Sequence, residues 1–332
     1  MTVLTTHPHY PAWKSQGGRW RTDEEVNGVK VRRLRHFVPR EPTLFKRMLA
    51  ELSFGIRALM TKWPQADAIV LVSPGLLATF VIQAKAARKA PTAVWVQDLY
   101  SLGASETGSL GRVGLRCLRW VERSTLYGAD LVVVIHKRFS DWLSAELTVP
   151  RDRIRVLRNW THLRMSATDR QAARSSLGWN DKETIALHAG NQGLKQGLDV
   201  VVEAAQLAEA ASKPVRFVLL GDGNQHSRLR AAGESCEHLE FIEPLPDAEY
   251  IAVMRAADVL LVSELPGVSE MSVPSKLTSY FASGLPVVAA TSGGGVTAEE
   301  LSAAGAGIRV DPASPVDLLV AIERLGNYPA LS

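Results

Sequence analysis

Short apolar runs alternate with helix-like segments along almost the whole chain, and this alternation limits the fold more than any other feature. The runs most typical of buried strands lie at residues 68–72, 93–97, 131–135, 184–188, 215–220, 259–262 and 286–289. The clearest helical patterns lie at residues 110–126, 198–211, 247–256 and 275–282. Apolar strands without polar alternation are typical of parallel sheets with helices on both faces. The sequence therefore predicts an α/β protein with doubly wound parallel sheets.

The predicted strands fall into two groups, which indicates two domains. The first group ends near residues 156–157 and the second begins near Thr184. The polar stretch 158–170 between them is interpreted as a linker, so we expect one domain at residues 1–160 and another at residues 161–332. This length is sufficient for two ordinary cores. Two such domains in tandem would face a central cleft at the carboxyl ends of their strands, where this architecture binds ligands.

Charge is divided unequally between the two halves. Residues 1–165 contain 26 lysines and arginines against 13 acidic residues, whereas residues 166–332 contain 12 against 21. A basic half is suited to phosphates, nucleic acid or an anionic membrane. Its arginines accompany apolar side chains at residues 31–57 and 111–123, which either lie on a membrane surface or form amphipathic helices packed on a sheet. No nucleic-acid-binding module is recognisable, so nucleic acid is not an expected partner.

Cysteine content and hydropathy bear on the compartment. Cys117 and Cys236 are the only cysteines and belong to no CxxC pair, which excludes a zinc site built on thiolates and indicates a reducing compartment. The first ten residues lack the apolar core of a signal peptide, and the longest apolar stretch, 69–82, is too short to cross a bilayer. We therefore expect a cytoplasmic protein that is soluble or peripheral to a membrane.

A glycine-rich turn follows the predicted strand 184–188. Residues 190–197 read GNQGLKQG, and a helical pattern begins directly after them. Such a turn lets backbone N–H groups approach an anion, the dipole of the following helix favours negative charge, and Lys195 adds a cation. The segment indicates a phosphate-binding loop, with an ordinary connection and a surface lysine as the alternative.

A second, shorter turn, Gly221-Asp222-Gly223, follows the strand at 215–220. Asp222 could accept hydrogen bonds from a ribose or a base. Glycines also occur in turns because they adopt positive φ angles, and for this turn alone that interpretation is the simpler one.

The helical pattern at 275–282 begins with four polar side chains: Ser275, Lys276, Thr278 and Ser279. Hydroxyl groups, a lysine and the free N–H groups of a first helical turn together form an anion site. The alternative is a helix capped by Ser275 with a solvated lysine. Because Lys195 and Lys276 would come from neighbouring loops, the anion site is favoured.

Several carboxylates occupy positions where this fold class binds ligands. Asp98 follows the predicted strand 93–97, and a charged side chain at the carboxyl end of such a strand often contacts a ligand, although it also caps helices. Glu264 and Glu270 precede the helical pattern at 275–282 and could accept hydrogen bonds from sugar hydroxyls.

Other motifs are missing from the sequence. It contains no DxD, so a metal site that chelates a nucleotide diphosphate through two aspartates is not expected, and it contains neither a P-loop nor a GxSxG sequence. His136 and His188 lie beside apolar runs and are interpreted as core or capping residues.

Four segments of the second half resemble, in order and spacing, the nucleotide-sugar domain of family 4 glycosyltransferases. They read HAGNQGLKQGLDVVVEAA, FVLLGDGNQHSRL, FIEPLPDAEYIAVMRAADVLLV and VPSKLTSYFASGLPVVAAT. In the first half, WVQDLY, ADLVVVIH and VLRNWTH are similar to the colanic-acid or capsule-type branch of that family. The resemblance covers nearly the whole chain and implies the GT-B fold, with two tandem Rossmann-like domains.

The resemblance also implies an activity. Members of this family transfer a hexosyl unit from a nucleotide-diphosphate sugar to a lipid-linked or polysaccharide-precursor acceptor in cell-envelope or exopolysaccharide biosynthesis. The reaction would retain the anomeric configuration and need no metal, and no cofactor is expected besides the nucleotide-sugar co-substrate. The basic first domain would be in peripheral contact with the anionic inner face of the cell membrane.

The implied roles carry over residue by residue. The family's pair that holds the donor diphosphate falls on Asn191 and Lys195, and the turn at 221–223 would lie along the nucleotide. The family also has two paired glutamates. The second falls near Ser279, and Glu270 is the acidic residue nearest to the position of the first. The residues expected to be catalytic are Asp98, Lys195, Lys276 and Glu270. The residues expected to bind the donor are Gly190, Asn191, Gln192, Gln196, Gly197, Gly221, Asp222, Gly223, Ser275, Thr278 and Ser279.

Compared with the family, the chain is expected to lack the first strand with its glycine loop and the terminal crossover helix. Two alternatives to an active transferase therefore stay open: a truncated, non-catalytic module that binds nucleotide sugars, and a GT-B-like nucleotide-sugar epimerase.

Overall fold

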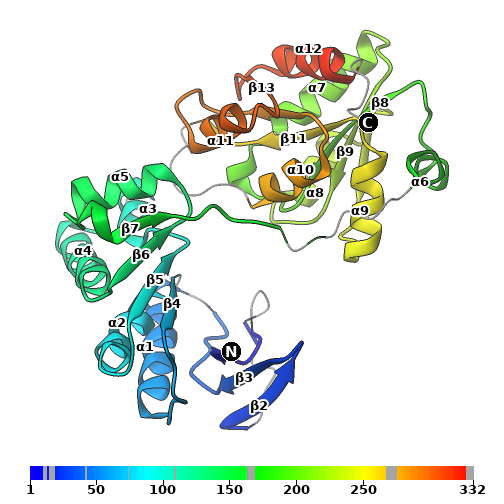
Figure 1. Ribbon diagram of the computed structural model, residues 1–332. Coiled ribbons are helices and arrows are strands. Elements are labelled where there is room, and N and C mark those ends of the chain that lie inside the picture. Colours follow the sequence, from blue (N-terminus) through cyan, green and yellow to red (C-terminus); the bar gives the residue numbers. More distant parts are fainter. Residues whose placement is uncertain are drawn as a thin grey trace. The chain divides into compact units, whose positions relative to one another are not determined.

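The computed structural model describes residues 1–9, 13–14, 19–41, 43–73, 75–107, 110–161, 163, 169–266 and 275–326. The chain divides into two compact units, Met1–Arg158 and Asn159–Ser332. Figure 1 labels the elements of both units. No helix in these described ranges is long and apolar enough to cross a membrane.

The larger sheet of unit 1 consists of four parallel strands in the order β4-β5-β6-β7. The strands are β4 (Ile69–Ser73), β5 (Thr92–Val96), β6 (Leu131–Val134) and β7 (Ile154–Val156). The helices are α1 (Leu44–Met60), α2 (Leu76–Ala87), α3 (Tyr100–Thr107), α4 (Arg112–Tyr127) and α5 (Lys137–Glu146). Val94, Val132 and Phe139 belong to the buried core, which explains why β5 and β6 are continuous apolar runs.

A separate three-stranded sheet of unit 1 was not predicted as a whole. Its strands are β1 (Thr2–Thr6), β2 (Arg21–Val26) and β3 (Val29–Leu34) in the order β1-β3-β2, and β2 runs antiparallel to β3. Asn27 and Gly28 form the hairpin turn with φ angles of 50° and 77°. Across the hairpin, Arg32 donates to Asp23 and Arg33 donates to Glu24. These two arginines of the basic half therefore have acidic partners in the same hairpin.

Unit 2 contains one sheet of six parallel strands in the order β10-β9-β8-β11-β12-β13. The strands are β8 (Thr184–Ala189), β9 (Val215–Leu220), β10 (Leu239–Ile242), β11 (Val259–Ser263), β12 (Val287–Ala290) and β13 (Gly307–Val310). From β8 the chain adds β9 and then β10 on one side. It then returns to the other side of β8, where it adds β11, β12 and β13 in that order. The strand order therefore reverses between β8 and β11, and open α/β sheets bind ligands at the carboxyl ends of the strands at such a point.

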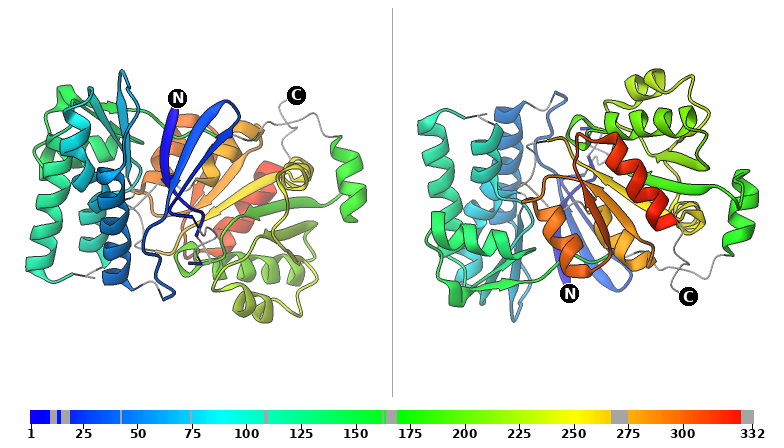
Figure 2. Two further views of the ribbon diagram at one scale, coloured as in Figure 1. Left: turned by 90° about the horizontal axis from the view of Figure 1, so that it is seen from below. Right: turned by 90° about the horizontal axis from the view of Figure 1, so that it is seen from above.

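Helices cover both faces of this sheet, as Figure 2 shows. They are α6 (Arg170–Leu177), α7 (Asp199–Ala210), α8 (His226–Ala232), α9 (Asp247–Ala256), α10 (Lys276–Ser283), α11 (Val296–Ala304) and α12 (Pro315–Gly326). Phe217 packs with α7 and α12 in one core cluster, and its neighbour Val218 packs with α9 and α10 in the other. Both faces of β9 are thus buried, and the predicted doubly wound α/β fold is confirmed.

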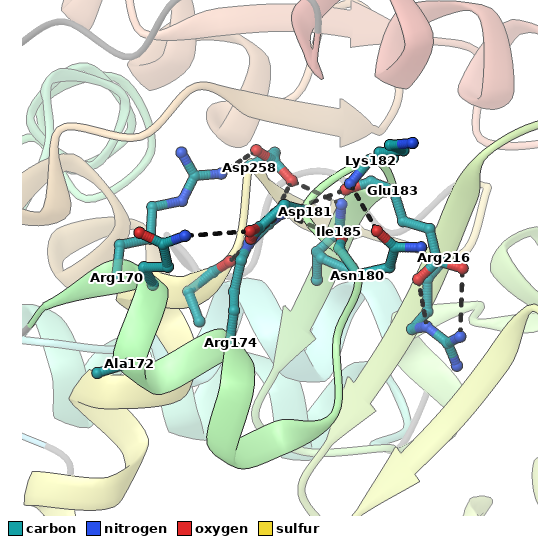
Figure 3. A network of polar contacts seen from close by, with 12 residues as sticks. Arg170, Ala172, Arg174, Asn180, Asp181, Lys182, Glu183, Ile185, Arg216 and Asp258 are labelled. Carbon is teal, nitrogen blue, oxygen red and sulfur yellow. Dashed lines mark hydrogen bonds and ion pairs between the residues drawn. The ribbon is translucent and has the colours of Figure 1, made fainter.

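A polar cluster at the amino ends of these strands attaches α6 to the sheet of unit 2 (Figure 3). The Arg174 side chain is only 4% exposed; it forms an ion pair with Asp258 and donates a hydrogen bond of 2.9 Å to the Ala256 carbonyl. Asp258 also accepts from Arg170 and from the N–H of Ile185, the second residue of β8. A buried arginine is tolerated because it has these partners.

Candidate functional site

The switch-point edge is the carboxyl end of β8 and β11 together with the turns 190–197 and 221–223 and the first turn of α10. Backbone hydrogen bonds hold the first of these turns in place. Gly190 N–H donates to the Leu220 carbonyl, and Gln192 N–H donates to the Asp222 carbonyl, both at 2.8 Å. The carbonyl of Lys195 accepts from Leu265 N–H, also at 2.8 Å. The turns after β8, β9 and β11 are therefore one connected structure, as the parallel strand order requires.

Glycine is required where the two glycine turns touch. Gly190 and Gly221 have φ angles of +132° and +129°, and a Cβ atom on Gly221 would lie 2.1 Å from the Gly190 carbonyl oxygen. A Cβ atom on Gly223 would lie 2.5 Å from the Gln192 carbonyl oxygen. Gly197 adopts the left-handed conformation, with φ +53°, against Leu265. Both the φ angles and the close backbone contacts therefore exclude a side chain at Gly221.

Gln192 connects the two turns from within. Its side chain is buried, its Nε2 donates to the Gly221 carbonyl at 3.0 Å, and its Oε1 lies 2.9 Å from Nδ1 of His226. Because the amide nitrogen is the donor to Gly221, its oxygen faces the imidazole as an acceptor, which assigns a proton to His226 Nδ1. Gln192 thus stabilises the loop that carries Lys195.

The remaining polar residues of the turns lie nearer the surface. Gln196 Oε1 accepts from Gly193 N–H at 3.1 Å and from Asn191 Nδ2 at 3.3 Å, so this amide closes the turn on itself. The side chains of Asn191, Lys195 and Asp222 are exposed, and Asp222 accepts from Gly223 N–H at 2.6 Å. The first turn therefore presents an amide and a cation to solvent, and the second presents a carboxylate.

Half-buried Lys276 and fully buried His188 form a close polar pair at the switch-point edge. Lys276 is the first residue of α10, and its Nζ lies 3.0 Å from Nε2 of His188, near the end of β8. A Cβ atom on Gly190 would lie 3.5 Å from the same Nζ, so the amine borders the glycine turn directly. Burial lowers the pKa of Lys276 to about 7, against an opposing effect of Glu264. Burial, reinforced by Lys276, also lowers the pKa of His188 well below its usual value.

Tyr280 fixes the helix that carries Lys276. It is fully buried, its hydroxyl oxygen accepts from Ala189 N–H at 2.9 Å, and the hydroxyl lies 3.3 Å from the Leu261 carbonyl as a donor. These contacts join α10 to the ends of β8 and β11. One turn of helix before Tyr280, Lys276 is therefore directed at the same strand ends.

The hydroxyl groups of the α10 segment differ in their surroundings. Thr278 Oγ1 donates to the Ser275 carbonyl at 2.7 Å, which satisfies the threonine's own proton. Ser279 Oγ lies 3.2 Å from Thr161 Oγ1, and Ser275 is exposed. Of the four polar residues predicted here, Lys276 has the closest contact with the glycine turns. Glu270, predicted to be catalytic, lies outside the described residues.

Glu264 follows β11 and is held by two buried threonines. The hydroxyls of Thr291 and Thr297 donate to its two carboxylate oxygens, the second at 2.5 Å. Burial raises the pKa of Glu264, while the hydroxyls and Lys276 act in the opposite direction. The sequence analysis considered Glu264 but missed the threonines. His188, interpreted there as a core or capping residue, is fully buried and is the penultimate residue of β8.

Asp98 belongs to unit 1, where it is exposed after β5. Nearby, the Tyr100 hydroxyl donates to Glu51 at 3.0 Å and accepts from Gly75 N–H at 3.0 Å. Glu122 accepts from Tyr100 N–H at 2.8 Å, and burial raises the pKa of both glutamates. These bonds fix the segment that follows Asp98. Among the residues described in either unit, no cluster of three or more His, Cys, Asp or Glu could hold a metal ion.

The two units match two known domain families. Residues 1–160 match the family described as a glycosyl transferase 4-like domain, and residues 183–327 match the family described as glycosyl transferases group 1. Solved structures of such enzymes have the same fold. A sucrose-phosphate synthase from Thermosynechococcus elongatus superimposes with a TM-score of 0.66 over 97% of this chain and 78% of its own, at 20% identity. The chain belongs to the glycosyltransferases of the GT-B fold, and it is an enzyme of that class.

Two individual glycosyltransferases are similar to this chain, one in sequence and one in fold. The putative colanic acid biosynthesis glycosyl transferase WcaI of Escherichia coli K12 is 29% identical over 301 residues, which is 85% of this chain and 73% of WcaI. Anabaena HepE, solved in complex with UDP, superimposes with a TM-score of 0.60 over 77% of this chain and 68% of its own, at 17% identity. The resemblance to the colanic-acid-type glycosyltransferases is thus confirmed.

Proposed function

We propose that unit 2 binds a nucleotide-diphosphate sugar at the switch-point edge. The observation that carries this proposal is the position of the Lys276 amine. It lies beside Gly190, and Gly190 is where the turn after β8 contacts the turn after β9. Lys276, Lys195 and the backbone N–H groups of the turns would hold the diphosphate. Glu264 would accept hydrogen bonds from sugar hydroxyls, and the exposed Asp222 would accept them from the nucleoside. The complex of HepE with UDP supports a nucleotide ligand for this fold.

The protein would then transfer the hexosyl unit with retention of configuration and without a metal ion. The bond between the anomeric carbon and the β-phosphate oxygen breaks, and its electron pair leaves with the nucleoside diphosphate. The acceptor hydroxyl oxygen bonds to the same face of that carbon and gives its proton to the departing diphosphate. Negative charge develops on the leaving group, so the cations at 195 and 276 accelerate the reaction by stabilising it there.

We further propose that the acceptor is a lipid-linked or polysaccharide-precursor sugar of the cell envelope, used at the inner face of the cytoplasmic membrane. The colanic acid assignment of WcaI supports a polysaccharide product. In unit 1, α4 carries the exposed apolar side chains Val113 and Trp120, and exposed arginines stand on the same helix at 112, 116 and 123. An exposed tryptophan among arginines is suited to peripheral contact with an anionic membrane.

The test is a transfer assay. Labelled UDP-, GDP-, ADP- and dTDP-hexoses are incubated with the enzyme and with bacterial membranes as the source of acceptor, with and without EDTA. We expect one nucleotide class to label the lipid fraction, with EDTA having no effect and the new glycosidic bond keeping the configuration of the donor.

Substitutions of the two lysines test whether the diphosphate site is assigned correctly. Lys195→Ala and Lys276→Ala should each lower turnover at least about a hundredfold, which is the usual loss when one group that stabilises transition-state charge is removed. Lys182→Ala is the matched control, because Lys182 is exposed at the amino end of the same sheet. Wild-type turnover in both site variants would refute the assignment of the diphosphate site, and binding without transfer would favour a non-catalytic module.

A further inference from the structure

Helix α1 of unit 1 presents large apolar side chains to solvent instead of to the core. Phe45, Ile56 and Met60 are 68%, 50% and 77% exposed. Together with three further exposed residues they form a set that we call the α1 arc: Phe45, Met48, Leu49, Ile56, Leu59 and Met60. At about 3.6 residues per turn, these positions fall within roughly a third of the helix circumference. A surface helix normally has the reverse arrangement, with its apolar stripe toward the core.

The opposite side of α1 attaches the helix to unit 1. Ala58 is buried, and Gly55 packs so closely on α2 that a Cβ atom there would lie 3.0 Å from the Cα atom of Ala78. Glu51 accepts a hydrogen bond of 3.0 Å from the N–H of Leu77, in the first turn of α2. Small residues thus face inward and large apolar residues face outward. The helix cannot rotate to bury the α1 arc without losing these contacts.

Helix α1 belongs to a layer of three helices, because α2 contacts both α1 and α4 (Figure 1). On α4, the exposed indole of Trp120 contacts Phe80 of α2 edge-on, with 5.7 Å between the ring centroids. The exposed apolar side chains of α1 and α4 therefore belong to one layer of unit 1. Exposed apolar groups gathered in this way mark a contact with a partner or a membrane.

The same three helices are strongly basic. Together they contain eight lysines and arginines but only two acidic residues, Glu51 and Glu122. Both carboxylates accept hydrogen bonds from backbone N–H groups within unit 1. Beside the α1 arc, the guanidinium group of Arg57 lies 4.7 Å from the ring centroid of Trp20, which is itself exposed. The layer thus offers apolar side chains and cations to its surroundings.

We propose that the α1 arc inserts into the anionic face of a membrane, with α1 lying in the interfacial plane and the cations of its layer on lipid phosphates. A wide apolar face with basic residues around it is the pattern of helices that bind lipid interfaces. The assignment rests on the proposed function, in which unit 1 contacts the membrane that holds the acceptor. It adds the surface that enters the lipid, whereas α4 supplies arginines and one tryptophan at the same interface.

This orientation brings the predicted acceptor side of unit 1 to the membrane. Glu51, in the first half of α1, also accepts from the Tyr100 hydroxyl at 3.0 Å. Tyr100 begins α3, two residues after Asp98 and after the carboxyl end of β5. With the α1 arc in the lipid, the segment that carries Asp98 would stay near the surface at which a lipid-linked acceptor presents its sugar.

The test is co-sedimentation of the full chain with vesicles of phosphatidylglycerol and phosphatidylcholine. A double variant, Phe45→Gln with Ile56→Gln, should lower the partition coefficient at least about tenfold, because two apolar side chains lose their burial in lipid. Val316→Gln with Val320→Gln is the matched control. Both valines are 57% exposed on α12 of unit 2, so their replacement should leave the partition coefficient unchanged.

A fluorescent label distinguishes insertion from adsorption by charge alone. Cys117 is exposed and Cys236 is buried, so a Cys117→Ser protein can be labelled with bimane at a single new cysteine. On vesicles, doxyl-labelled lipids should quench the label at Ile56→Cys, and aqueous iodide should lose access to it. The label at Val320→Cys should stay accessible to iodide. These single replacements at exposed positions decide the matter if the double glutamine variant does not fold.

The outcomes separate the two proposals. If the wild type does not bind anionic vesicles, the membrane contact of the proposed function fails together with the α1 arc. If the wild type binds, but the double glutamine variant keeps its partition coefficient or the label at position 56 stays in water, the α1 arc alone is refuted. If sedimentation velocity shows a dimer that the glutamine variant loses, a second copy covers the α1 arc, and the proposal is equally refuted.

Discussion

A Cβ atom on Gly221 would lie 2.1 Å from the carbonyl oxygen of Gly190, so the turns after β8 and β9 meet backbone to backbone. This contact explains why both turns are rich in glycine. It also places Gln192, whose amide joins the same two turns, in the interior rather than toward solvent. The diphosphate loop is therefore supported by its neighbour, and its shape depends on residues that do not themselves contact a ligand.

Gly221→Ala should destabilise unit 2 and weaken donor binding together. The substitution introduces both a steric clash with Gly190 and a side chain at a φ of +129°, so we expect the free energy of unfolding to fall by roughly 2–4 kcal/mol. Urea denaturation measures the loss. Gly294→Ala is the control, since a Cβ atom there would have no neighbour within 4 Å. Equal effects of the two substitutions would contradict the close backbone contact.

Lys276→Met should stabilise the protein at low pH while it abolishes donor binding. The pKa of this buried amine falls from 10.5 to about 7 on folding, so below pH 7 the folded state carries a charge that burial disfavours. Each pKa unit corresponds to about 1.4 kcal/mol, so the variant should be more stable than the wild type by roughly 3–5 kcal/mol at pH 6. Between pH 7 and 10.5 the unfolded chain binds more protons than the folded one, so wild-type stability rises with pH and the advantage shrinks. Denaturation at pH 6 and 9 tests this, and a pH-independent difference would argue against it.

Arg174→Ala should unfold unit 2 more readily without affecting the Kd for the donor. The substitution leaves Asp258 without its buried partner, and breaking such a pair from one side costs about 3–5 kcal/mol. Arg228→Ala is the comparison, because Arg228 pairs with Asp199 on the surface, where such a pair contributes about 0–1 kcal/mol. Thermal unfolding of the two variants should differ clearly, and similar midpoints would mean that the cluster in Figure 3 does not stabilise α6 as described.

Trp120→Ala should weaken binding to anionic vesicles several-fold. The indole is 62% exposed on α4 beside arginines and packs edge-on against Phe80, so its removal takes away an interfacial anchor whose surface lies mostly outside the core of unit 1. Co-sedimentation with vesicles of phosphatidylglycerol and phosphatidylcholine measures the effect, and pure phosphatidylcholine vesicles are the control. Unchanged sedimentation with the anionic vesicles would remove the support that α4 gives to the membrane proposal.

The central strands could be predicted from sequence because they are buried on both faces. β8, β9 and β11 are mostly apolar for this reason, and helix α9 was predicted with the bounds that the structure gives. The edge strands β10 and β13 were missed because they are four residues long and partly exposed, so they lack a continuous apolar signal. The hairpin strand β2 was missed because its sequence, RTDEEV, is almost entirely polar.

The candidate site could be predicted only in part. The turns at 190–197 and 221–223 follow adjacent parallel strands, so their proximity is a consequence of the predicted topology. The pairing of Lys276 with His188 joins residues 88 positions apart, and it depends on the way Tyr280 seats α10 on the strand ends. Sequence periodicity carries no information about such a contact. The position of His188, two residues before Gly190, was the one available signal.

The central claim is that unit 2 binds a nucleotide-diphosphate sugar through Lys276, and a thermal-shift measurement tests it most directly. The wild type, Lys276→Ala and Lys182→Ala are each heated with UDP-, GDP-, ADP- and dTDP-hexoses. A ligand at about 100 times its Kd stabilises the folded state by roughly 2.7 kcal/mol. We predict that one nucleotide class raises the Tm of the wild type and of Lys182→Ala by several degrees and leaves Lys276→Ala unchanged. An equal rise in all three proteins, or a rise in none, would contradict the account.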